Sequence, residues 1–399
     1  MVLSKNLITS IVLLLCVTSN VALIACKSDE PTKPVTKPGG NGGDNDGEDP
    51  TSSFNYIYKE NTGGFQVYRI PAIVKANSGR LLAFAEARKL RSGGDSGDID
   101  MVVKLSDDNG KTWGNMITIW DEGVNTCGNP VPIVDKVTGK IHLLLTWNNG
   151  ADDWAALTNG TGKDTRRVYY TSSSDEGATW SKPREITSSV KSSTWDWYAT
   201  GPVHGIQISK GTYKGRLVSP NYFTERVDGR RQDLSHAIYS DDNGLTWKSG
   251  AATKTGGVGE CTVAELSDGR LMMNFRVSSG NVRKYSISED GGETWGDIQT
   301  DYTLVDAICQ GSLLSAPIDN KHMMFFANAA SVERKNMTVK LSNDNGSNWT
   351  KKVSIHSGPS AYSDMTLTAQ GKIALVYEGG VGRPYEGIAF KMLELGDFK

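Results

Sequence analysis

The sequence lacks the features of strongly charged, disulfide-linked and metal-binding proteins. Its 399 residues include 43 lysines and arginines against 45 aspartates and glutamates, for a formal net charge of −2. Because a general nucleic-acid binder carries a basic surplus, this balance argues against a nucleic-acid partner. Only five cysteines are present, and none belongs to a CxxC pair that would suggest a metal site. We therefore expect no disulfide framework, no metal and no other cofactor.

Long uninterrupted apolar runs are missing as well. The most apolar segment lies within residues 1–25, and polar side chains break it, so it is shorter than a membrane-spanning helix. A lysine before the apolar run is typical of a secretory signal peptide. The segment ends in Leu-Ile-Ala-Cys (23–26), which resembles a bacterial lipobox, in which the cysteine is lipidated after cleavage. We predict a signal peptide over 1–25 and lipid on Cys26. A coincidental cysteine near an ordinary cleavage site is the alternative.

Residues 26–53 hold four prolines and five glycines with mixed charge. Such a segment buries too little apolar surface to order itself, so we expect a flexible tether. Residues 54–399 are long enough for one domain with a well-buried core. We expect a monomer that is exported across the inner membrane. Its lipid, as the only membrane contact, would hold it at the outer membrane or cell surface, facing the periplasm or the exterior.

The three cysteines that remain after the leader and the lipid site have a simpler explanation. Cys127, Cys261 and Cys309 are an odd number, so at least one thiol is free. We expect all three to be small buried apolar side chains.

One octet of residues recurs along the chain with the pattern S-x-D-x-G-x-T-W. Aspartate bonds the backbone of its own turn and glycine supplies a positive φ, so the octet predicts a tight turn, with tryptophan entering the core. The copies are residues 106–113, 173–180, 240–247 and 288–295, with a degenerate fifth at 342–349 in which Asn348 replaces threonine.

The segments between the octets alternate or are apolar over strand lengths, and no helical period competes with them. Short strands and turns that recur at this spacing are typical of a β-propeller. At about 50–60 residues per blade, residues 54–399 make about six blades. The sequence therefore predicts an all-β, six-bladed β-propeller.

The octets resemble the Asp boxes of the sialidase superfamily, which are structural turns far from the active site. Upstream of the first octet, Tyr68-Arg69-Ile70-Pro71 resembles the sialidase [F/Y]-R-I-P motif. The resemblance covers nearly all of residues 54–399. It implies a glycoside hydrolase, an exo-α-sialidase that releases terminal sialic acid from sialylated glycoconjugates with retention of configuration.

Sialic acid carries a carboxylate on its anomeric carbon, and arginine matches carboxylate geometry bidentately. The resemblance implies a clamp of three arginines, Arg69, Arg276 and Arg334. Arg283 and Lys335 remain rivals of the third. A buried arginine cluster needs a carboxylate partner, and Glu378 resembles the family's late Tyr-Glu pair that orients the first arginine.

The resemblance also implies a tyrosine nucleophile, since a neutral phenol avoids the repulsion that a carboxylate would meet at this centre. A phenol needs a base beside it. Tyr362, within Ala-Tyr-Ser-Asp, matches the nucleophile, and Glu260 matches the base. Three other tyrosines are the alternatives: Tyr285, Tyr302 and Tyr377.

The acid/base residue should be a carboxylate in the glycine-rich segment 91–100. Asp95 stands at the family's spacing there, and Asp98 and Asp100 compete with it.

Further sugar contacts follow from the resemblance. Arg88 matches an arginine that contacts the 4-hydroxyl. Trp147 and Trp154, seven residues apart, match a pair that bounds the N-acetyl pocket, although core packing is an alternative for Trp147. Asn129 stands where many relatives have an aspartate that contacts the sugar, so that contact is in doubt.

Three other functions compete with hydrolysis. A trans-sialidase, including the intramolecular kind that yields an anhydro sugar, would keep the fold and change the acceptor. A sialic-acid-binding lectin should have lost the proposed catalytic residues, and all are present. A propeller that only scaffolds protein partners would not explain three such arginines. The linkage preference is left open.

Overall fold

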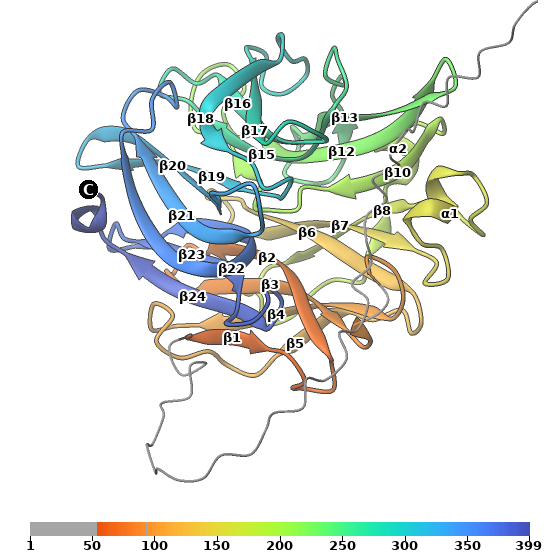
Figure 1. The fold of residues 1–399 in the computed structure, drawn as a ribbon, viewed down its shortest axis with the longest axis horizontal. Helices are drawn as coiled ribbons and strands as arrows, with labels where there is room; N and C mark the ends of the chain where they lie inside the picture. The colour runs from red at the N-terminus through yellow and green to blue at the C-terminus, as the bar shows by residue number, and fades with distance from the viewer. Residues whose placement is uncertain (1–53, 92–93) are drawn as a thin grey trace, which may run out of the picture. The chain divides into compact units, whose positions relative to one another are not determined.

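The computed structural model describes residues 54–91 and 94–399, drawn in colour in Figure 1. The predicted signal peptide, the lipid on Cys26 and the tether over 26–53 lie outside the described residues. Strands dominate the regular structure, which confirms the all-β prediction. The helical elements are short, among them α1 (Trp154–Thr158), α2 (Thr187–Val190) and the 3₁₀ turn η3 (Leu395–Asp397). No helix within these residues is long and apolar enough to cross a membrane.

Within residues 54–91 and 94–399 the strands form four hydrogen-bonded sheets. The first has eight strands: β2 (Val67–Lys75), β3 (Leu81–Arg88), β4 (Ile99–Ser106), β5 (Ile117–Trp120), β6 (Thr126–Val134), β7 (Ile141–Asn148), β8 (Arg167–Ser173) and β9 (Arg184–Glu185). The second has five: β10 (Trp195–Thr200), β11 (Ile206–Gln207), β12 (Leu217–Val227), β13 (Arg230–Ser240) and β14 (Lys248–Ser249). The third has four: β15 (Val258–Glu265), β16 (Leu271–Val277), β17 (Val282–Ser288) and β18 (Gln299–Val305). The fourth has seven: β19 (Ser312–Ile318), β20 (Lys321–Ala329), β21 (Lys335–Ser342), β22 (Lys351–Leu367), β23 (Ile373–Gly379), β24 (Gly387–Leu393) and β1 (Tyr56–Lys59).

Two of these sheets are composed of smaller antiparallel groups. In the eight-stranded sheet, a single parallel pair, Ile99 with Thr126, joins β2–β5 to β6–β9. In the seven-stranded sheet, the 17-residue strand β22 pairs first with β21 and then with β23. β1 pairs with β24, so the start of the described chain joins its end. These antiparallel groups are consistent with the predicted propeller. Because the described strands form four hydrogen-bonded sheets, the count of six blades stays a prediction.

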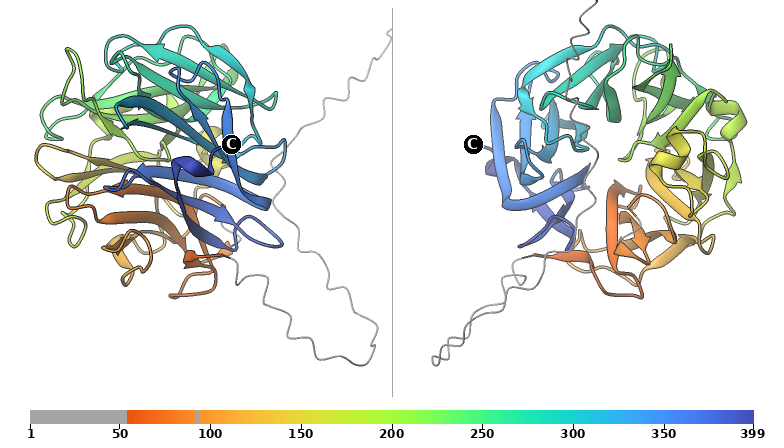
Figure 2. Two further views of the ribbon diagram at one scale, coloured as in Figure 1. Left: turned by 90° about the vertical axis from the view of Figure 1, so that its left-hand side faces the viewer. Right: turned by 45° about the vertical axis from the view of Figure 1, so that its right-hand side comes forward.

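The strand groups lie around a common centre, as the right-hand view of Figure 2 shows. Apolar side chains fill the space between neighbouring groups; for example, Phe84 of β3 and Leu143 of β7 belong to one buried cluster. Burial of such surface is the main favourable contribution to folding. Cys127, Cys261 and Cys309 are buried and free, which confirms the prediction for these thiols.

Each octet forms a turn after the third strand of its group, as predicted. In the first, Asp108 accepts hydrogen bonds from the backbone N–H (2.9 Å) and the hydroxyl (2.6 Å) of Thr112. The backbone N–H of Gly110, at a φ of 78°, donates to Ser106 Oγ at 2.8 Å. In the degenerate fifth copy the Asn348 side-chain amide donates to Asp344 at 2.7 Å. Asparagine therefore replaces threonine without loss of the turn.

The octets lie away from the residues predicted to bind sugar. Ser106, which opens the first octet, pairs with Leu81 at one end of β3. Arg88 lies at the other end of β3, opposite Ile99. Eight strand residues span about 25 Å. This separation fits a structural role for the octets.

Candidate active site

Several predicted site residues lie where the strands nearest the centre are irregular. Five of these strands change register over a short interval, and such bulges bend a strand and re-aim its side chains. The intervals are Arg69/Ala72 on β2, Gly128/Val131 on β6, Trp195/Tyr198 on β10, Val258/Cys261 on β15 and Ser360/Ser363 on β22. They bear Ile70, Asn129, Trp197, Glu260 and Tyr362, respectively.

The first bulge is held in a strained conformation by one buried carboxylate. Ile70 has a φ of 57°, which is rare for a β-branched residue. Glu378 accepts hydrogen bonds from the Ile70 backbone N–H at 2.9 Å and from Arg69 Nε at 2.9 Å and Nη2 at 3.2 Å. It also accepts from the backbone N–H of Tyr362 at 3.2 Å. The predicted partner of Arg69 thus ties together the strands that bear Arg69 and Tyr362.

Tyr362, Glu260 and Arg276 form a hydrogen-bonded trio. The Tyr362 hydroxyl donates to Glu260 Oε1. Arg276 Nη1 donates to Glu260 Oε2 at 2.6 Å and to the Tyr362 hydroxyl at 3.2 Å. Burial, followed by the charge of Glu260, raises the pKa of Tyr362 well above its usual value despite the neighbouring arginines. The phenol therefore keeps its proton at rest and points it at a base.

The alternative tyrosines lie elsewhere. Tyr302 is 83% exposed, Tyr377 belongs to a buried apolar cluster, and Tyr285 packs against another. The trio therefore favours Tyr362 over these three as the candidate nucleophile.

Two more arginines surround the Tyr362 ring. The guanidinium of Arg69 lies 5.0 Å from the ring centroid and that of Arg334 lies 5.7 Å from it. Tyr385 bridges them, because its hydroxyl accepts from Arg334 Nη1 at 2.6 Å and its ring lies 4.2 Å from the Arg69 guanidinium. Tyr385 lies between β23 and β24, and no motif of the sequence marks it.

The rivals of Arg334 have other partners. Arg283 is fully buried beside Asp306 and donates to the carbonyl of Cys309 at 2.8 Å. Lys335 is exposed and pairs with Glu333 at 2.7 Å. The geometry therefore favours Arg334 as the third member of the arginine group.

Asp95 lies beside Arg88, whose Nη2 donates to it at 3.0 Å. Arg88 also donates to buried Glu86 at 2.5 and 3.0 Å. Partial desolvation raises the pKa of Asp95, but the charges of Arg88, Arg69 and Arg166 outweigh it and hold that pKa well below its usual value. The Asp95 side chain stays 57% exposed, so a ligand can reach it.

The competing aspartate Asp100 has different surroundings. It is buried and lies 3.5 Å from Lys89. Burial, with a contribution from Asp121, raises its pKa to about 6. Asp100 pairs with Lys89, whereas Asp95 pairs with Arg88, so the two aspartates have different partners.

Arg166 is the main site residue that no sequence motif marks. It is almost fully buried, and its guanidinium lies 3.8 Å from the ring centroid of Trp197. Its Nη2 donates to Asn129 Oδ1 at 2.9 Å, and the Asn129 backbone N–H donates to Glu86 at 2.8 Å. Within the described residues, its Nε and Nη1 have no hydrogen-bond partner. Burial lowers the pKa of Arg166. Arg166 therefore has two unpaired donors that are buried, and its charge acts on Asp95.

The two predicted tryptophans have contacts of a different kind. Trp147 packs against the apolar cluster that contains Leu143, and the Arg167 guanidinium lies 5.7 Å from its ring centroid. These contacts match the core-packing alternative. Trp154, the first residue of α1, is 43% exposed, and Arg231 lies 4.2 Å from its ring centroid. A sugar contact for either tryptophan stays a prediction.

Comparisons with known proteins agree with this arrangement. The BNR repeat-like domain family matches residues 79–375. The chain is 30% identical over 351 residues to a sialidase from Bacteroides fragilis (strain YCH46), covering 83% of this chain and 62% of that protein. It is 32% identical over 370 residues to an exo-alpha-sialidase from Aspergillus fumigatus, covering 84% of this chain and 86% of that protein.

A solved structure is similar over the same region. The Hadza microbial sialidase Hz136 has a TM-score of 0.75 at 29% identity, covering 84% of this chain and 66% of that one. The chain therefore spans slightly less than two thirds of the length of Hz136 and of the Bacteroides sialidase.

Proposed function

The chain belongs to the sialidase family of glycoside hydrolases, and from that membership we propose that it is an exo-α-sialidase. It hydrolyses terminal α-ketosidically linked sialic acids of glycoproteins, glycolipids and oligosaccharides. The observation that carries the proposal is the buried Tyr362 hydroxyl, which donates to Glu260 between the guanidinium groups of Arg69, Arg276 and Arg334. All of these groups come from one chain, so we propose that it acts as a monomer.

The three arginines bind the substrate carboxylate, which places the anomeric carbon next to the Tyr362 oxygen. Tyr362 attacks this carbon and its proton passes to Glu260, while the bond to the leaving oxygen breaks and Asp95 protonates that oxygen. Asp95 then takes a proton from water, and the water oxygen displaces Tyr362, which recovers its proton from Glu260. Two displacements give net retention.

The low pKa of Asp95 in the free protein bears on the first step. A general acid must carry a proton, yet Arg88, Arg69 and Arg166 favour the ionised form of Asp95. A bound substrate carboxylate offsets part of the charge of Arg69 and raises the pKa of Asp95. Substrate binding thereby favours the protonated acid that the reaction needs.

Time-resolved NMR of α2,3-sialyllactose with the protein tests this function. We expect the α-anomer of free sialic acid to appear first and then to mutarotate. A first product with β configuration would contradict the retaining route. An anhydro sugar or a transfer product would indicate a trans-sialidase, and binding without turnover would indicate a lectin.

We propose that the unpaired donors of Arg166, which are buried in the free protein, become accessible to an oxygen of the sugar when the substrate binds. Arg166→Met should raise KM about tenfold or more, the effect of losing a hydrogen bond to a charged donor. The free energy of unfolding should stay level or rise, because methionine removes a buried, poorly paired charge. Removing this cation should also raise the pKa of Asp95, so the alkaline limb of the kcat/KM profile should move to higher pH.

Arg80→Met is the control, since Arg80 forms a surface pair with Asp107 at 2.6 Å. It should leave KM and the pH profile unchanged. Wild-type KM and an unmoved alkaline limb in Arg166→Met would contradict the proposed contact.

We also propose that lipid on Cys26 anchors the protein to the outer membrane or cell surface. The support is the lipobox-like segment 23–26 and the tether that follows it. Cys26→Ala should move the protein from the membrane fraction to the soluble fraction. Cys16→Ala, within the predicted leader, should not. Unchanged fractionation of Cys26→Ala would refute the anchor and leave the enzymatic proposal standing.

A further inference from the structure

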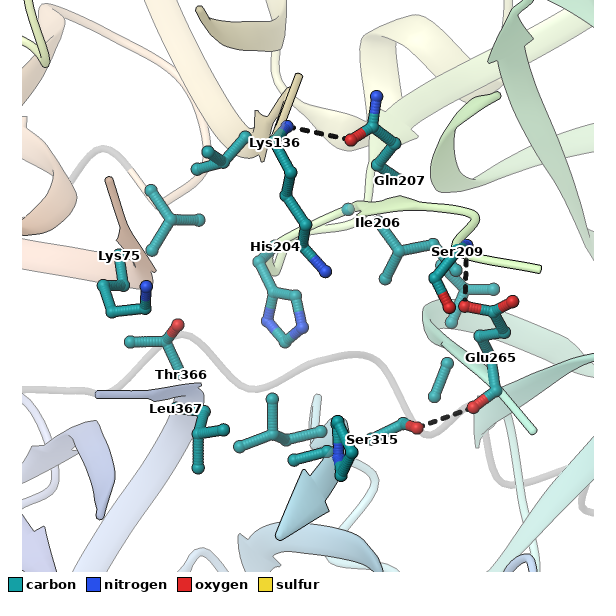
Figure 3. Close-up of a pocket in the computed structure, with 18 of the residues that line it drawn as sticks. Lys75, Lys136, His204, Ile206, Gln207, Ser209, Glu265, Ser315, Thr366 and Leu367 are labelled. Atoms are coloured by element: carbon teal, nitrogen blue, oxygen red, sulfur yellow. Dashed lines mark hydrogen bonds between the residues drawn. The ribbon is translucent and has the colours of Figure 1, made fainter. Parts of the chain in front are cut away.

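A cavity lies at the far end of the strands that bear the candidate site. Its volume is about 550 Å³, within the range of small-molecule sites. On β2, Lys75 lines the cavity six residues after Arg69; on β22, Thr366 lines it four residues after Tyr362. At about 3.3 Å per residue, the cavity is roughly 13–20 Å from the candidate active site. It is therefore a separate place on the molecule, shown in Figure 3.

The walls of this cavity carry a surplus of positive charge. Lys75, Lys136 and Lys210 line it, and Glu265 is the single carboxylate among its described lining residues. The oxygens of Glu265 accept from the backbone N–H groups of Ser209 at 2.9 Å and Lys210 at 3.0 Å. These backbone donors hold the carboxylate in place, and its single negative charge offsets only one of the three lysines.

The lysines themselves have few partners. Lys210 Nζ donates to the carbonyl of Ser267 at 2.9 Å, which leaves its charge uncompensated. In the part of the chain that the structure describes, neither Lys75 nor Lys136 forms an ion pair. Figure 3 shows the side chain of Lys136 extending toward His204, with Lys75 on the opposite side of the ring.

His204 is held in a fixed orientation inside the cavity. Its Nδ1 is 2.7 Å from Asp364 Oδ1, and Asp364 Oδ2 accepts from the backbone N–H groups of His204 (3.0 Å) and Ile73 (2.9 Å). Because Asp364 occupies Nδ1, the other ring nitrogen is the one available to a ligand. A second imidazole, that of His322, lines the cavity 3.4 Å from the hydroxyl of Ser315.

We propose that this cavity binds a small anion of about monosaccharide size through a carboxylate or phosphate group. Lysines act as point charges for such oxyanions. The ammonium groups of Lys75 and Lys136 hold the anionic group, and the free nitrogen of His204 accepts a hydrogen bond from a hydroxyl of the ligand. The hydroxyls of Ser209 and Ser315 contact the rest of the ligand. This binding does not depend on the proposed sialidase activity.

Isothermal titration calorimetry of the purified chain tests the proposal with inorganic phosphate and D-glucuronate as probes. A sialic acid glycal should first saturate the arginine site, so that only a second site is reported. We expect at least one probe to bind saturably. Phosphate alone would identify a phosphate site, and glucuronate alone a carboxylate site. No saturable binding of either would overturn the proposal.

Variants locate the binding. Lys136→Glu reverses an exposed charge and should lower the affinity for the probe more than tenfold. Lys75→Met should lower that affinity about tenfold. Lys254→Met is the control, because Lys254 is exposed and pairs with Asp297 at 2.9 Å. Thermal unfolding of each variant should match the parent. Equal affinity in the parent and in Lys136→Glu would refute the site, as would equal losses in Lys254→Met.

Discussion

Replacement of Tyr362 by phenylalanine should lower kcat by about three orders of magnitude or more, while a sialic acid glycal still binds. The change removes only the attacking oxygen, so the ring still packs between the guanidinium groups of Arg69 and Arg334. Glu260 keeps its hydrogen bond to Arg276. Steady-state kinetics with an aryl sialoside, whose leaving group needs little protonation, isolates the attack.

Glu260→Gln should be similarly severe, because the phenol would then have no base to take its proton. The double variant should lose little more than the worse single variant, since the two groups act in one step. Tyr302→Phe is the matched control, as Tyr302 is almost fully exposed. Near-normal kcat in Tyr362→Phe would overturn the assignment of the nucleophile.

Glu378→Ala should lower the free energy of unfolding by about 3–5 kcal/mol, the effect of leaving a buried charge without its partner. Glu378 is fully buried and pairs with Arg69 at 2.9 Å. It also accepts from the backbone of Ile70 and Tyr362, so its loss releases the strained bulge and frees both site strands. Urea unfolding at neutral pH measures the change.

Glu378→Gln separates the charge from the shape. Glutamine keeps the volume of the side chain and one acceptor, so this variant should be more stable than Glu378→Ala. Its KM should still be higher than that of the wild type, because Arg69 has lost its charged partner. Glu394→Gln removes an exposed partner of Lys372 and should cost less than about 1 kcal/mol. An unchanged urea midpoint in Glu378→Ala would contradict the proposed support of the site by this carboxylate.

Some contacts in the site join segments that are far apart in the sequence. They were predictable nevertheless, because a motif marks the residues on both sides. Arg69 and Glu378, 309 residues apart, were each found by their match to a family motif, and the resemblance also implied their pairing. Arg166 and Tyr385 have no such neighbours. Only the fold shows that Arg166 lies on Trp197 and Asn129, and that Tyr385 bridges two arginines.

Local sequence is enough to predict the strand-and-turn architecture, because alternation and the aspartate–glycine octets are local properties of the chain. The tertiary structure decided where the strands bend. Nothing local marks Ile70 for a positive φ, since isoleucine favours regular strand, and the buried carboxylate of Glu378 holds it there. Gly128 likewise appears unremarkable in sequence. In the fold, a Cβ at this position would lie 2.4 Å from Glu86, the carboxylate that supports Arg88 and Asn129. Such constraints come from groups far away in the chain, so no local pattern records them.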